Sequence, residues 1–266
     1  MNLNRKKLTI VSLILVLLFS LTGCSLLGNG KQTYASYVKS LLDVNYKADY
    51  TEYMKITGAT EEEAKKVYDD GITYLAEALM TAYGINDVEG SDIKDQFSQL
   101  AKDIYSHASY EVTEVTKTDG VYQVTVTIYP IDILTTTYDD VVAYIENMNN
   151  RVTAGDYNDY ELDEYETEYA QGILDILTAA VPNIGNGEGV PVTVTIQDND
   201  EYYYISDADF LALDKAILAT PVVNEDGITD STDSSENNGE GASDSTDSTD
   251  AADSTDAADS SDTTEQ

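Results

Sequence analysis

The sequence has one cysteine, no tryptophan and few basic residues. A single cysteine excludes an intramolecular disulfide and a zinc site built from several cysteines. Fifty acids against only 14 lysines and arginines give the 266 residues a formal charge of −36. The chain therefore lacks the basic face that a nucleic-acid-binding protein needs. Phenylalanine occurs three times and tyrosine 21 times, so the aromatic packing of a core must come mainly from tyrosine.

Long apolar runs are also scarce, and the only pronounced one stands near the N-terminus. Arg5, Lys6 and Lys7 form a positive segment, and residues 8–21 follow as a nearly continuous apolar stretch. This stretch is shorter than the roughly 20 residues that a helix needs to cross a bilayer. It suits the central part of a secretory signal peptide instead. Residues 1–23 are therefore predicted to be a signal peptide.

A short motif behind this stretch predicts lipid attachment. Leu21-Thr22-Gly23-Cys24 resembles the lipobox of bacterial lipoproteins, in which a small residue precedes the cysteine and a leucine stands three positions before it. The resemblance implies cleavage before Cys24 and a diacylglycerol, with chains such as palmitate, on its sulfur. Two acyl chains anchor a protein stably. The expected location is the extracytoplasmic face of a bacterial membrane; an ordinary signal peptide with a chance cysteine is the alternative.

Behind the predicted signal peptide, the chain divides into three parts. Residues 24–33 form a short tether, too few for a long stalk. Residues 34–220 carry the apolar periodicity and are long enough for one domain with one core. Residues 221–266 hold fourteen acids and no base. They are predicted to be disordered, because they have little apolar surface to bury and repel themselves. A solubilising tail is expected; weak binding of divalent cations and glycosylation are the alternatives.

Within residues 34–220 the apolar spacing alternates between a helical and a strand-like period. Helical spacing occupies 34–54, 60–82, 91–108, 141–148, 162–180 and 206–217, and strand-like alternation occupies 110–117, 121–129, 190–197 and 202–205. The first strand pair flanks Asp119-Gly120, a typical type I′ hairpin turn. This order predicts an α+β fold, in which an antiparallel sheet of two hairpins packs against several helices on one face.

Residues suited to catalysis or metal binding lack a supporting motif. His107 is the only histidine, and its place in the last turn of a predicted helix favours a structural role. Carboxylate pairs of the kind that glycosidases use arise by chance among so many acids. Residues 156–161 fail as a calcium loop, because Tyr160 and Glu161 stand where a ligand and a glycine are needed. No catalytic, metal-binding or cofactor-binding residue is assigned, and no cofactor is expected.

Two further motifs are predicted to have structural roles. The glycine-rich residues 185–189 resemble a phosphate loop only superficially, because they follow a helix and open a strand. They are therefore predicted to be a connector. The run Tyr202-Tyr203-Tyr204 is predicted to fill the core in place of tryptophan and phenylalanine. Stacking of its rings on a sugar or a peptide is the alternative.

Two stretches of the sequence resemble a known group of proteins. They are Tyr53-Met54-Lys55-Ile56-Thr57-Gly58-Ala59-Thr60-Glu61-Glu62-Glu63-Ala64, and Tyr110-Glu111-Val112 with the hairpin that runs into Tyr129-Pro130-Ile131-Asp132. Together they resemble small lipoproteins of Gram-positive Firmicutes that carry a domain of unknown function. Some of those are similar to cystatin-like or NTF2-like cones, in which a bent sheet and helices enclose a pocket. The resemblance implies no functional residue other than Cys24.

The sequence thus favours a membrane-anchored, non-catalytic binding or interaction module, linked to the membrane through Cys24. Its ligand would be a small molecule, a peptide or an envelope polymer, and no nucleic acid is expected. The alternatives are a carboxylate-dependent hydrolase acting on envelope polymers and a surface spacer or adhesin. A tyrosine-lined pocket without paired carboxylates would favour binding, whereas two acids about 5–9 Å apart in a cleft would favour hydrolysis.

Overall fold

The main sheet of the protein contains the two predicted hairpins side by side. The computed structural model describes residues 19–20, 30–87, 91–198, 202–221, 223–224 and 227–228. The sheet strands are β2 (Ser109–Thr118), β3 (Val121–Tyr129), β4 (Val190–Asp198) and β5 (Tyr202–Ile205), with β1 (Phe19–Ser20) beyond β5. Their order is β1-β5-β4-β3-β2, and every neighbouring pair is antiparallel.

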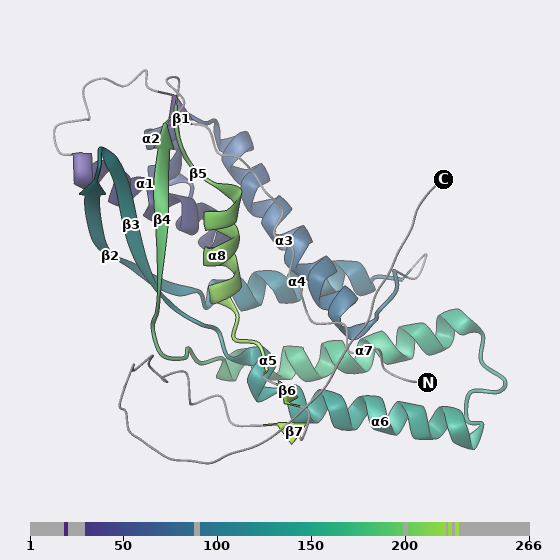
Figure 1. The fold of residues 1–266 in the computed structure, drawn as a ribbon. Coiled ribbons are helices and arrows are strands. Elements are labelled where there is room, and N and C mark those ends of the chain that lie inside the picture. The colour runs from purple at the N-terminus through teal and green to yellow at the C-terminus, as the bar shows by residue number, and fades with distance from the viewer. Residues whose placement is uncertain are drawn as a thin grey trace, which may run out of the picture. The chain divides into compact units, whose positions relative to one another are not determined.

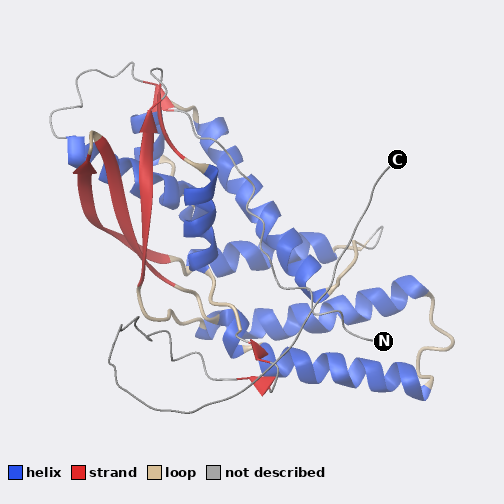
Figure 2. Cartoon of the chain, in the orientation of Figure 1, coloured by secondary structure: helices blue, strands red, loops and turns tan. Residues whose placement is uncertain are grey.

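Helices make up most of the remaining described chain. Four precede the first hairpin: α1 (Gly30–Lys47), α2 (Thr51–Thr57), α3 (Glu61–Tyr83) and α4 (Ile93–Ser106). Between the hairpins stand α5 (Ile133–Thr136), α6 (Tyr138–Ala154), α7 (Leu162–Ala180) and the 3₁₀ turn η1 (Val181–Asn183), and α8 (Asp207–Ile217) follows the second hairpin. Figures 1 and 2 show α1 and α8 beside the sheet and α6 and α7 as an antiparallel pair apart from it. The predicted α+β fold is confirmed.

The two faces of the sheet differ as the alternating sequence predicts. Val124, Val126 and Ile128 of β3 are fully buried against the helices, as is Val194 of β4. On the opposite face the hydroxyls of Thr125 and Thr193 form a hydrogen bond of 2.9 Å across the strand pair. The first three residues of the repeated Val-Thr-Val-Thr-Ile thus pair like with like between β3 and β4: Val124 with Val194, Thr125 with Thr193 and Val126 with Val192.

The predicted ends of several helices are confirmed in detail. Thr60 caps α3: its hydroxyl accepts from the backbone N–H of Glu63, and the Glu63 carboxylate accepts from the backbone N–H of Thr60. This reciprocal pair satisfies donors that a helix start would otherwise leave unpaired. Pro182 lies in η1, directly after the end of α7. His107 stands at the C-terminal end of α4, as expected.

The structure also corrects the helix prediction at two places. The stretch 34–54 is two helices rather than one, because Ala48 takes the left-handed conformation with φ +51° and turns the chain. The Asp49 carboxylate then accepts from the backbone N–H of Thr51 and starts α2. The short helix α5 has no periodic pattern long enough to be detected from the sequence.

Short strands occur in two segments predicted to lie outside the domain. Phe19 and Ser20, from the predicted signal peptide, pair with β5. Within residues 221–266, β6 (Val223–Asn224) pairs with β7 (Gly227–Ile228), a ladder that the charge and periodicity of this segment do not predict. Cys24, and with it the predicted lipid attachment, lies outside the described residues, as does the chain from 229 onward.

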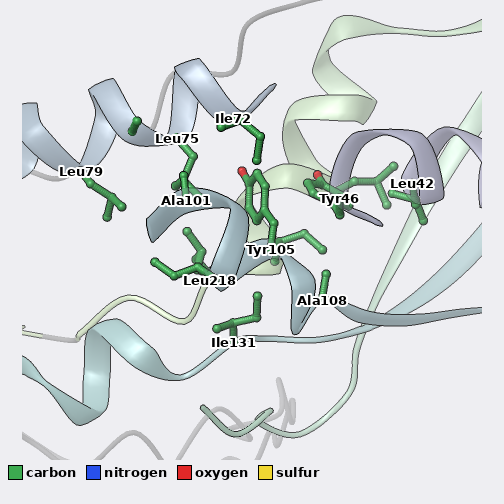
Figure 3. Close-up of a cluster of buried hydrophobic side chains, with 14 of the residues drawn as sticks. Leu42, Tyr46, Ile72, Leu75, Leu79, Ala101, Tyr105, Ala108, Ile131 and Leu218 are labelled. Atoms are coloured by element: carbon green, nitrogen blue, oxygen red, sulfur yellow. The ribbon is translucent and has the colours of Figure 1, made fainter. Parts of the chain in front are cut away.

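Tyrosine takes the place of the missing tryptophan in the core, as predicted. The buried tyrosines are Tyr34, Tyr37, Tyr46, Tyr53, Tyr105 and Tyr110. Figure 3 shows Tyr46 and Tyr105 among aliphatic side chains that include Leu42, Ile72 and Leu75. Near the second hairpin, the rings of Tyr34 and Tyr203 meet edge to face at 5.3 Å.

The turn of the first hairpin gives a direct test of this fold. Asp119 has φ +53° and Gly120 has φ +89°, as a type I′ turn requires, and a Cβ added at Gly120 meets no atom within 4 Å. Only backbone strain therefore opposes a side chain there. Gly120→Val should lower the free energy of unfolding, measured by urea denaturation, by about 1–3 kcal/mol. Asp119→Asn should be nearly neutral, because Asn-Gly suits the same turn. Equal stability of Gly120→Val and wild type would contradict the turn.

Candidate functional site

A buried carboxylate joins α8 to the helices of the core. Asp214, only 8% exposed, lies on α8 beside the buried Leu213. The Tyr46 hydroxyl donates to its Oδ1 at 3.1 Å, and Tyr105 also forms a hydrogen bond with its carboxylate. The rings of Tyr46 and Tyr105 meet edge to face at 4.9 Å. The Asp214 carboxylate of α8 thus contacts one tyrosine from α1 and one from α4.

The electrostatics of this cluster indicate a structural role. Burial raises the pKa of Asp214, and the hydrogen bonds from the two tyrosines partly oppose that rise. Burial also raises the pKa of Tyr46 and of Tyr105 well above 10, so both phenols stay protonated and can donate. Asp214 is thus a buried acid held by tyrosine hydroxyls, not one open to a substrate.

A second tyrosine–aspartate contact ties the sheet to α1. The Tyr110 hydroxyl of β2 donates to Asp43 Oδ1 at 2.9 Å, and Lys39 forms an ion pair with the other oxygen of Asp43 at 2.6 Å. The Lys47 ammonium lies 4.5 Å from the centre of the Tyr110 ring, where a cation is attracted by the ring face. These contacts fix the start of β2 against the end of α1.

The end of the α6–α7 hairpin is the second feature built from polar tyrosines. Arg151, in the last turn of α6, donates to Glu168 of α7 at 2.6 Å. The Tyr157 hydroxyl donates to the same carboxylate oxygen at 3.0 Å, and the Arg151 guanidinium lies 4.6 Å from the centre of the Tyr157 ring. The Tyr144 hydroxyl donates to the backbone carbonyl of Glu168 at 2.8 Å. Side chains from α6, from α7 and from the segment between them therefore restrain the connection of the two helices.

Two structural details set how the hairpin is packed. A Cβ added at Gly172 of α7 would overlap the ring of Tyr144, so glycine lets the two helices approach at this point. The Tyr169 hydroxyl donates to the backbone carbonyl of Tyr83 at 2.8 Å, which joins α7 to the end of α3. The hairpin is thus attached to the helical part of the domain.

Three apolar side chains at the hairpin end are exposed. The exposed fractions are 48% for Val152, 45% for Tyr160 and 67% for Leu162. Tyr160 packs its ring edge to face with Tyr157 at 5.0 Å, and Tyr165 packs in the same manner on Tyr157. Exposed apolar patches mark interaction surfaces, and these three side chains place apolar surface at one end of the hairpin.

The remaining residues singled out from the sequence have structural surroundings. The backbone carbonyl of His107 accepts a hydrogen bond from the Asn186 amide at 3.3 Å. The glycine-rich residues 185–189 connect η1 to β4, and Gly187 donates to the backbone carbonyl of Pro130 at 2.7 Å. Among the residues that the structure describes, no group of three or more His, Cys, Asp or Glu side chains could hold a metal ion.

Sequence reasoning missed Asp214 and the exposed hairpin end. Asp214 follows Phe210 by four residues and so shares the apolar side of α8, a position where an acid is unusual. That spacing is the signal that could have identified it. The acids of the hairpin end stand out in the sequence, but its apolar members do not, because only the structure shows that they are exposed. Among the described residues, no helix has the length and apolarity needed to cross a bilayer.

Comparison with known proteins gives little to place the chain. No protein-family model matches it, and neither does any curated protein. A crystal structure of a protein of Bacillus subtilis subsp. subtilis str. 168, described as a lipoprotein (ycdA), shares 18% sequence identity with a TM-score of 0.46. The alignment covers 70% of this chain and 56% of that one. At this level the likeness assigns neither a family nor a function.

Asp214 should make the stability of the fold depend on pH. Because its pKa is raised in the folded state, the folded chain binds this proton more tightly than the unfolded chain does. Its contribution is therefore most favourable below the ordinary aspartate pKa of about 4, and declines as the pH rises through the raised value. Urea denaturation from acid to neutral pH should show wild type losing stability relative to Asp214→Asn. A difference that is constant, or that changes in the opposite direction, would contradict this.

The close approach at Gly172 should reverse the usual benefit of alanine in a helix. Alanine is favoured over glycine in a helix interior by about 1 kcal/mol. At Gly172, however, the methyl group must displace the Tyr144 ring and break its hydrogen bond to α7. Gly172→Ala should therefore destabilise the domain by about 1–3 kcal/mol in thermal or urea unfolding.

The matched control is Gly71→Ala in α3. A Cβ at Gly71 would come no closer than 3.7 Å to its nearest neighbour, the Asn45 carbonyl oxygen, which is an ordinary contact. This substitution should be neutral or stabilise the domain by up to about 1 kcal/mol. If both substitutions changed stability in the same direction and by the same amount, Tyr144 would not limit the packing of α6 on α7.

Proposed function

We propose that this chain is a lipoprotein, anchored through Cys24 to the extracytoplasmic face of a bacterial membrane, and that its folded part acts by binding a partner rather than by catalysis. The proposal that the folded part binds a partner rests on the exposed apolar end of the α6–α7 hairpin. Val152, Tyr160 and Leu162 are presented to solvent on a scaffold held by the Arg151–Glu168 ion pair.

The sequence supports the anchor. A basic segment, an apolar stretch and Leu21-Thr22-Gly23-Cys24 occur in the order that a lipoprotein signal peptide needs. The chain has no other cysteine, so the thiol has no disulfide partner within the chain. Two acyl chains on Cys24 would supply a stable attachment without a membrane-spanning helix.

The buried acid supports binding over hydrolysis. A hydrolytic acid must be kept neutral near a second, ionised carboxylate in reach of the substrate. Asp214 does have a raised pKa, but its carboxylate is occupied by the hydroxyls of Tyr46 and Tyr105 and is almost inaccessible to solvent. Its surroundings therefore suit the joining of α8 to the core.

The anchor is tested by metabolic labelling of cells with a clickable fatty acid. Wild-type protein should be labelled and shortened by cleavage, whereas Cys24→Ala should be unlabelled and should keep residues 1–23. Ser25→Ala is the matched control, since it leaves the lipobox intact and should be labelled like wild type. Protease added to intact cells or protoplasts should digest the anchored protein. Persistent labelling of Cys24→Ala, or protection from the protease, would contradict the assignment.

A further inference from the structure

We propose that the end of the α6–α7 hairpin, residues 151–168, is a docking surface for a basic protein segment that carries apolar side chains. This deepens the proposed binding function by naming its surface and the chemistry of its partner. Three properties of the hairpin end support such a partner: its exposed apolar side chains, its restrained backbone and its excess of negative charge.

The exposed apolar side chains are concentrated at this end. Leu162 occupies the first position of α7 and is 67% exposed, although full burial of a leucine side chain is favourable. Val152 and Tyr160 are exposed in the same short stretch. The other large exposed apolar residues of the described chain, Val121 and Val190, lie at the ends of sheet strands. A partner that covers the hairpin end would remove apolar surface of this stretch from water.

The backbone of the hairpin end is held in one conformation before a partner arrives. Gly155 ends α6 with φ +90°, and its N–H and that of Asp156 donate to the Arg151 carbonyl. Glu161 and Glu164 form a reciprocal cap at the start of α7. A surface ordered in advance loses less conformational entropy on binding, which favours affinity. The exposure of Leu162 is thus a property of an ordered surface.

The charge of the hairpin end selects a basic partner. Residues 151–168 contain one base, Arg151, and seven acids: Asp156, Asp159, Glu161, Asp163, Glu164, Glu166 and Glu168. Arg151 is already engaged by Glu168 and Asp156. The net charge around the apolar side chains is therefore strongly negative. Opposite charges on the two sides of an interface speed association and disfavour wrong partners.

The same charge argues against the other occupants. A second copy would bring two acidic ends together, and like charges across an interface are unfavourable. A membrane surface rich in anionic lipids would repel the acids, although Leu162 and Tyr160 alone could insert into it. The chain itself, with 50 acids against 14 bases, offers few basic residues to cover this end. A basic segment of another protein fits the apolar side chains and the charge together.

The test measures peptide binding to the full chain held in nanodiscs of neutral phosphatidylcholine. The probe is a fluorescein-labelled peptide that repeats Lys-Lys-Leu-Leu, and the readout is fluorescence anisotropy. Combined Tyr160→Ser and Leu162→Ser should weaken the Kd by about tenfold, as removal of central anchors in an interface does. Combined Val121→Ser and Val190→Ser, which removes two apolar side chains exposed elsewhere, should leave the Kd unchanged.

The contribution of charge is tested separately. Asp159→Asn with Asp163→Asn should weaken binding by about threefold at low salt and should reduce its salt dependence. Glu111→Gln with Glu114→Gln on β2 changes the net charge equally and should have little effect. A peptide that repeats Gln-Gln-Leu-Leu should bind much more weakly. Equal losses in the hairpin and control variants, or equal binding of the uncharged peptide, would overturn the proposal.

Two further outcomes would also overturn it. One is flotation of the Cys24→Ser chain with phosphatidylglycerol vesicles that Leu162→Ser abolishes, because the hairpin would then dock on a membrane. The other is a dimer, detected by sedimentation, that Leu162→Ser dissociates. Lipid labelling at Cys24 is scored in cells, whereas peptide binding is scored as the difference between hairpin and control variants held in the same nanodiscs. Peptide binding without labelling would refute only the anchor, and labelling without peptide binding would refute only the docking surface.

Discussion

The fold depends on one requirement: each tyrosine hydroxyl buried in the core needs a hydrogen-bond acceptor. Tyrosine replaces tryptophan and most phenylalanine here, and a buried hydroxyl without a partner is unfavourable by about 1–3 kcal/mol. Asp214 accepts from Tyr46, and Asp43 accepts from Tyr110. In the part of the chain that the structure describes, no buried side-chain nitrogen or oxygen lacks a hydrogen-bond partner. These contacts join elements far apart in sequence, since α1 meets α8 in one case and β2 in the other.

The tyrosine hydroxyls of the α6–α7 hairpin also need hydrogen-bond acceptors, and two of them use backbone carbonyls. Two of its tyrosines donate to backbone carbonyls rather than to acids: Tyr144 to Glu168 and Tyr169 to Tyr83. These bonds attach α6 to α7 and α7 to α3, while the Glu168 side chain remains available for Arg151 and Tyr157. Polar groups are therefore paired with one another within the hairpin, whereas its apolar side chains Tyr160 and Leu162 face solvent. Folded domains usually bury apolar side chains and expose polar ones, and this reversed arrangement is the basis of the proposed docking surface.

Much of the architecture follows from local sequence signals. The Thr60–Glu63 cap, the Asp119-Gly120 turn and the alternation of β3 each identify an element, because each depends on residues close together in the chain. The split between α1 and α2 could not be predicted, since alanine at position 48 gives no sign of a left-handed conformation. Asp214 required knowledge of which tyrosines face it, and the hairpin end required exposure. Both arise from contacts between distant segments, which one sequence does not encode in a readable pattern.

The central claim is that Asp214, the one aspartate buried among the described residues, joins structural elements and that the domain works by binding. It is tested most directly by NMR titration of the carboxyl carbons between acid and neutral pH. The account predicts that Asp214 titrates in a single step above the ordinary aspartate range, and that Tyr46→Phe raises its pKa further by removing a hydrogen bond to the charged form. A two-step titration shared between Asp214 and a second carboxyl would reveal a coupled acid pair of the catalytic kind and would contradict the account.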